Sequence, residues 1–158
     1  MTNYDPEKPM DFSHDTDEVR ENNRAYALAD IRSSAHWFFW IAGLSIINTL
    51  ITAFSSSEIS FLAGLGITQL INGLITGLYG ENNMLVAVIN LLIAGIFIFI
   101  GIKARQAIKS AFIIGLILYG LDALIFLGFG IWLPFLFHCF VSYMIFKGMR
   151  QVDSYQAM

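Results

Sequence analysis

Apolar residues dominate the chain from residue 35 onward, where long uncharged runs alternate with short polar breaks. Four runs are long enough to cross, or nearly cross, a hydrocarbon core of roughly 30 Å at about 1.5 Å per helical residue. The pattern predicts an all-α, polytopic integral membrane protein with an antiparallel four-helix transmembrane bundle. The predicted spans are residues 35–54, 84–102, 111–127 and 131–146.

A fifth apolar segment, residues 59–79, has a helical period but a different character. One face carries Ile and Leu, whereas the opposite face is small or polar and has no charge, which favours packing against other helices. We therefore expect an amphipathic helix that re-enters the membrane or lies on its outer face. Its predicted packing face consists of Gln69, Asn72, Gly73, Thr76 and Gly77.

The first 34 residues form a polar arm that holds eight of the twelve acidic residues and four of the nine basic ones within residues 1–32. Asp15 followed by Glu18 resembles a capping box, which marks the start of a helix. A ragged apolar stripe follows and predicts a short amphipathic helix at the membrane surface. Residues 35–147 are the predicted membrane domain, and residues 148–158 a short cytoplasmic tail.

The distribution of basic residues decides between four spans and five, because cytoplasmic loops are enriched in Lys and Arg. With five spans, the bases of the arm would lie opposite those near residues 103–109 and 147–150. With four, all of them share one side, and the other side carries only Glu58 and Glu81. We therefore expect four spans with both termini cytoplasmic, in a bacterial inner membrane.

Composition agrees with the membrane class, because 56% of residues are hydrophobic, 13% are charged and 14 are phenylalanine. A soluble chain of this length could not bury so many aromatic side chains. No basic cluster is flanked by exposed aromatic residues, which excludes a nucleic-acid partner.

Four polar residues are predicted at one depth, since each lies six or seven residues, or roughly 9–10 Å, from the outer end of its span. Asp122 and His138 are expected to face each other, with Tyr119 and Ser142 one turn away. Ionisable residues at such depth often serve proton transfer or cation binding. The alternative is a structural hydrogen-bond layer, worth about 0.6–2 kcal/mol per bond. The four are Asn48, Asn90, Asp122 and His138.

Other chemistry finds little support in the sequence. Cys139 is the single cysteine, and the three histidines lack the spacing of metal ligands, so neither a metal nor a cofactor is expected. No phosphate-binding loop or Gly-flanked catalytic serine occurs.

Three functions remain open. The first is a non-catalytic subunit or assembly factor of a larger membrane complex. The second is a small oligomeric transporter or channel that uses the polar layer. The third is a membrane-embedded enzyme with Asp122 and His138 as acid and base. The expected partners are the lipid bilayer and either other membrane proteins or further copies of the chain.

Overall fold

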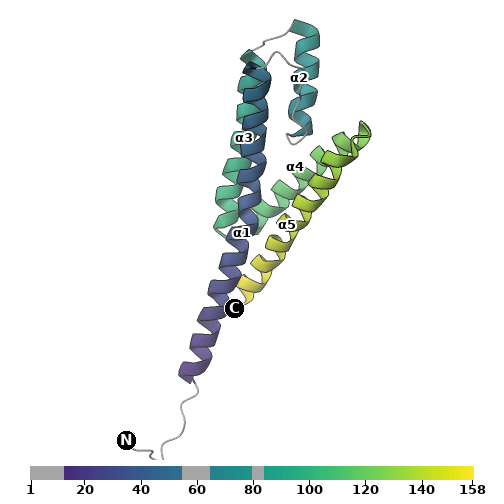
Figure 1. The fold of residues 1–158 in the computed structure, drawn as a ribbon. Coiled ribbons are helices and arrows are strands. Elements are labelled where there is room, and N and C mark those ends of the chain that lie inside the picture. Colours follow the sequence, from purple (N-terminus) through teal and green to yellow (C-terminus); the bar gives the residue numbers. More distant parts are fainter. Residues whose placement is uncertain (1–12, 55–64, 80–83) are drawn as a thin grey trace, which may run out of the picture.

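The computed structural model describes residues 13–54, 65–79 and 84–158, and over these ranges it is entirely helical. The chain forms α1 (Ser13–Phe54), α2 (Gly66–Tyr79), α3 (Met84–Arg105), α4 (Lys109–Gly128) and α5 (Trp132–Ala157), as Figure 1 shows. Four of these helices, all but α2, are long and apolar enough to cross a membrane. The predicted all-α fold with four candidate spans is therefore confirmed, in keeping with an integral membrane protein.

The long helices form two pairs (Figure 1). In one pair α3 runs back along α1, and in the other α5 runs back along α4. The pairs meet at one end, where α5 also packs on α1, and they diverge toward the other end. Helix α2 stands at the divergent end and contacts both α3 and α4.

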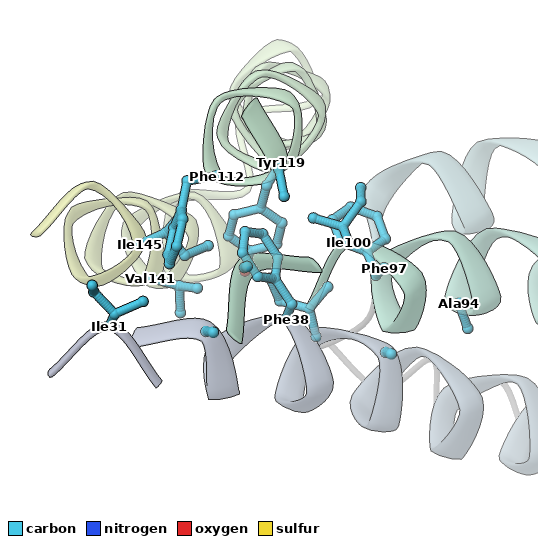
Figure 2. Close-up of a cluster of buried hydrophobic side chains, with 14 of the residues drawn as sticks. Ile31, Phe38, Ala94, Phe97, Ile100, Phe112, Tyr119, Val141 and Ile145 are labelled. Carbon is cyan, nitrogen blue, oxygen red and sulfur yellow. The ribbon is translucent and has the colours of Figure 1, made fainter. Parts of the chain in front are cut away.

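The core lies where the two pairs meet, and Figure 2 shows side chains converging on it from all four long helices. Phe38 of α1 and Phe112 of α4 are fully buried there, with ring centroids 6.0 Å apart. Glycines permit the close approach, since a Cβ at Gly115 would overlap the Phe38 ring and one at Gly148 would overlap Ser34. Small residues at such crossings are typical of membrane helix packing.

Helix α1 joins the predicted short surface helix to the first predicted span without a break. It is one helix of 42 residues that begins at Ser13, two residues before the predicted cap at Asp15. No proline or glycine occurs between Ser13 and Gly43, so nothing in this part of the sequence interrupts the helix. Residues 16–26 are exposed on all sides, and this part of α1 extends beyond the other helices (Figure 1).

Helix α5 also differs, because the predicted tail, residues 148–158, continues the helix to Ala157. Val152 is fully buried in the core. Nearby, Lys109 Nζ lies 2.6 Å from Asp153 Oδ1, and Gln156 Nε2 lies 3.5 Å from the Ala107 carbonyl oxygen. The tail is therefore packed against the connection between α3 and α4.

Candidate functional site

An acidic and a basic side chain are buried together on the α4–α5 hairpin. His138 Nε2 and Asp122 Oδ2 are 2.9 Å apart, and the two residues are only 1% and 4% exposed. The hairpin turn is short, and Gly130 takes the left-handed backbone conformation that closes it. Because both helices leave this turn at a fixed rise per residue, residues six to eight positions from it lie side by side.

Asp122 also binds the first turn of α2. The backbone N–H of Gly66 donates to Asp122 Oδ2 and that of Ile67 donates to Asp122 Oδ1, each at a distance of 2.8 Å. The first amides of a helix have no acceptor within the helix, and a nearby negative charge is favourable for its dipole. Leu65, directly before α2, offers no polar side chain as a cap, so α4 supplies the cap from a residue 56 positions away from Gly66.

This contact favours glycine at position 66, because a side chain there would crowd α4. A Cβ there would lie 3.0 Å from Phe126 Cε2 and 3.3 Å from both the Asp122 carbonyl oxygen and Ile125 Cβ. The backbone of α2 therefore touches α4 directly. Sequence analysis did not identify Gly66, although a helix that begins without a local capping residue is a signal that could have pointed to a distant cap.

The hydrogen bonds of His138 show that its Nδ1 atom carries a hydrogen and that a second proton lies between its Nε2 atom and Asp122. Its Nδ1 lies 2.8 Å from the Pro134 carbonyl oxygen, which can only accept, so Nδ1 carries a hydrogen. The 2.9 Å contact between Nε2 and Asp122 Oδ2 then needs one further proton, held by either partner. The pair thus holds one proton between the two groups and is neutral overall.

Aromatic rings enclose the imidazole. The Tyr119 ring is stacked on it at 4.3 Å with an interplanar angle of 15°, and the Phe126 ring is 4.9 Å away. These rings exclude water and hold the imidazole plane in the orientation that reaches Asp122.

The structure brings together only part of the predicted polar layer, namely Asp122, His138 and Tyr119. Asn48 and Asn90 are buried on α1 and α3, and Ser142 is half-buried on α5. Asn90 Nδ2 lies 3.5 Å from Asn72 Oδ1 on α2, whereas the hydrogen bonds of the Asp122–His138 pair go to α2 and Pro134. Equal depth did not produce contact, because the helix pairs diverge at this level.

The predicted packing face of α2 is only partly in contact with the described residues, through Asn72, which lies near Asn90 of α3. Gly73, Thr76 and Gly77 are exposed, and a Cβ at either glycine would meet nothing within 4 Å. Gln69 and Asn72 are half-buried. The physical reason is that α2 is held near its start, while the face beyond Asn72 is exposed.

A groove of about 300 Å³ lies beside the pair, between α2, α3 and α4. Its walls are apolar, with Leu65 and Ile67 at the start of α2 on one side and Ile93 and Ile96 of α3 on another. Asp122 is the single ionisable residue in its lining among the residues the structure describes.

Comparison with known proteins gives no match from which a role for the site could be inferred. No protein-family model, curated protein or solved structure matches the chain. In the described ranges, no group of three His, Cys, Asp or Glu side chains is placed to hold a metal ion.

Proposed function

We propose that this protein is a non-catalytic subunit or assembly factor of a larger membrane complex. In this proposal the Asp122–His138 pair is a structural anchor that holds α2 within the membrane. The observation that carries it is that both oxygens of Asp122 and both nitrogens of His138 already bond to groups of the protein. A catalytic acid or base needs an atom free to exchange a proton with its substrate, and all four nitrogen and oxygen atoms of this pair are already hydrogen-bonded within the protein.

The position of α2 supports a re-entrant helix. Its first turn lies at the level of Asp122, and the end of α1 and the start of α3 lie at the same end of the bundle (Figure 1). A segment that leaves and returns at one end does not cross the membrane. Non-helical backbone at this depth is tolerated where protein groups satisfy its amides, as Asp122 does here.

The basic residues support the proposed orientation. The α3–α4 connection, the last part of α5 and the first part of α1 lie at the end of the bundle opposite α2 (Figure 1). These segments carry Lys103, Lys109, Lys147, Arg24 and Arg32. By the positive-inside rule we assign this end of the bundle to the cytoplasmic side of a bacterial inner membrane, with both termini in the cytoplasm. Glu58 and Glu81, expected on the other side, lie outside the described residues.

The test is purification in mild detergent followed by native mass spectrometry. We expect the wild-type chain to retain a second membrane protein in fixed stoichiometry. Gly66→Ala, which displaces the start of α2, should lower that retention, whereas Gly43→Ala, whose Cβ meets nothing within 4 Å, should not. A chain that purifies only with itself, or equal retention by both variants, would contradict the proposal.

A transporter or channel is the second candidate, and one observation favours it: Asp122 borders the 300 Å³ groove. Reconstitution into liposomes separates the two candidates. A transporter of protons or cations would show a flux that Asp122→Asn abolishes. The subunit proposal expects no flux from either the wild-type chain or the variant.

A further inference from the structure

The cap on α2 depends on a group that can change its charge. Asp122 binds the α2 amides, and its charge depends on the single proton that it holds with His138. Proton occupancy of the pair and the position of α2 are therefore linked by direct hydrogen bonds, with no intervening residue.

We propose that the Asp122–His138 pair is a proton-binding site that controls α2: with one proton it holds the first turn of α2 against α4, and a second proton releases it. This goes beyond the structural role proposed above, because it makes the anchor reversible. The ligand is the proton itself, and the moving part is the first turn of α2 with the groove beside it.

A second proton would weaken the hydrogen bonds that hold the first turn of α2 on Asp122. It converts the Asp122 carboxylate to an acid, which is a weaker acceptor for the Gly66 and Ile67 amides. It also leaves a positive imidazole beside the positive end of the α2 dipole, with no counter-charge among the described residues. A buried charge without a partner is strongly unfavourable, so separation of α2 from the pair becomes favourable.

Among the side chains that the structure describes around the pair, none offers a compensating charge. From α4 the pair faces the Tyr119 phenol and the Phe126 ring, and from α5 the Phe137 ring. From α3, Phe97 reaches Tyr119, and from α1, Trp37 lines the small cavity beside the same tyrosine. None of these side chains carries a charge at neutral or acid pH.

Loss of the one proton is also unfavourable. A carboxylate and a neutral imidazole with hydrogen only on Nδ1 would put two lone pairs 2.9 Å apart. The one-proton state is thus the state that satisfies all of the hydrogen bonds. We therefore expect release as the pH falls.

Release would change the groove, because its lining includes parts on both sides of the contact. Leu65 and Ile67 belong to the start of α2, and Asp122 belongs to α4. Movement of the first turn of α2 away from α4 would widen the groove and expose Asp122 within it.

The test measures the distance between α2 and α4 by electron–electron double resonance on the full-length chain in lipid nanodiscs. Labels are placed at Leu74→Cys and Leu124→Cys, which are 66% and 57% exposed, with Cys139→Ser to remove the exposed native thiol. Between about pH 8 and about pH 4, where isolated His and Asp side chains titrate, we expect a reversible lengthening. The expected change is roughly 5 Å, one helical turn.

Variants identify the titrating pair. Asp122→Asn should give the longer distance at every pH, because no charge remains to be lost. Asp153→Asn, which removes an exposed carboxylate of the Lys109 ion pair, should keep the wild-type response. A wild-type distance that does not change with pH, or a response that persists in Asp122→Asn, would overturn the proposal. If Asp122→Asn does not fold, the wild-type titration still decides. No partner protein enters this measurement, so its outcome is independent of the subunit proposal.

Discussion

The two ends of the bundle are held together by different forces. At the end away from α2, side chains such as Ile31, Phe38 and Phe112 are fully buried between helices that touch through glycine. At the other end, α2 is fastened at its first turn, while Leu74 and Leu78 are 66% and 68% exposed. The first end is held by packing and the second by hydrogen bonds to one carboxylate.

This difference matters because lipid is as apolar as the helices and gives little hydrophobic force between them. Close packing therefore depends on many small dispersion contacts, which no single protonation can undo. A hydrogen-bonded cap depends on the charge of one group. The packed end can thus serve as a rigid frame, and the α2 end as the part that can move.

The largest effect is expected from disturbing the packed end with Gly148→Ala. The new Cβ would overlap Ser34 Cβ, which is bonded to the α1 backbone and cannot turn aside, and would lie 3.0 Å from Phe112 Cε1. Helices α1 and α5 must then separate, at a cost of about 1–3 kcal/mol. The measurement is the free energy of unfolding in a detergent titration.

Gly120→Ala is the matched control, because a Cβ on this glycine of α4 meets nothing within 4 Å. It should leave the unfolding free energy unchanged or raise it slightly, since alanine favours the helix. Equal losses in the two variants would mean that the close α1–α5 contact does not hold the frame.

A smaller and local effect is expected from Gly66→Ala. Its Cβ would crowd Phe126 and Ile125 and push the α2 amides away from Asp122. We expect a cost of about 1–2 kcal/mol, in line with the loss of a helix cap, and confined to α2. A spin label at Leu74→Cys should gain mobility in the electron paramagnetic resonance spectrum while the unfolding of the whole bundle changes little.

Gly73→Ala is the control for this prediction, because it makes the same change in the same helix without any contact. The label should stay as immobile as in the wild-type chain. A gain in mobility in Gly73→Ala, or none in Gly66→Ala, would show that α2 is not held at its first turn.

The sequence was sufficient for the four long helices and for the pairing of Asp122 with His138. Apolar runs identify the helices, and a short hairpin with a fixed helical rise places residues on either side of the turn at one height. Counting residues from the ends of the spans did not show whether Asn48 and Asn90 lie beside the pair, because equal depth does not tell which helices diverge. Asn90 lies near Asn72 of α2, whereas Asp122 of the Asp122–His138 pair accepts a hydrogen bond from the Gly66 amide.

The cap on α2 could not be predicted, since the groups that bind Asp122 are backbone amides, which have no sequence signature. Gly66 is one of 13 glycines, and only the structure distinguishes it from Gly73. The helical tail was missed for a related reason. Its charged and amide residues hide the one apolar residue, Val152, that packs in the core.

The smallest effect is expected at that tail, where Asp153→Asn removes the ion pair with Lys109. The two atoms lie 2.6 Å apart, but the side chains are 41% and 54% exposed, so solvent screens the attraction. We expect a loss of at most about 1 kcal/mol in unfolding free energy, and less at high salt. The measurement is detergent unfolding at low and high ionic strength. A larger loss that persists at high salt would mean that the tail locks the α3–α4 connection through this pair and belongs to the rigid frame.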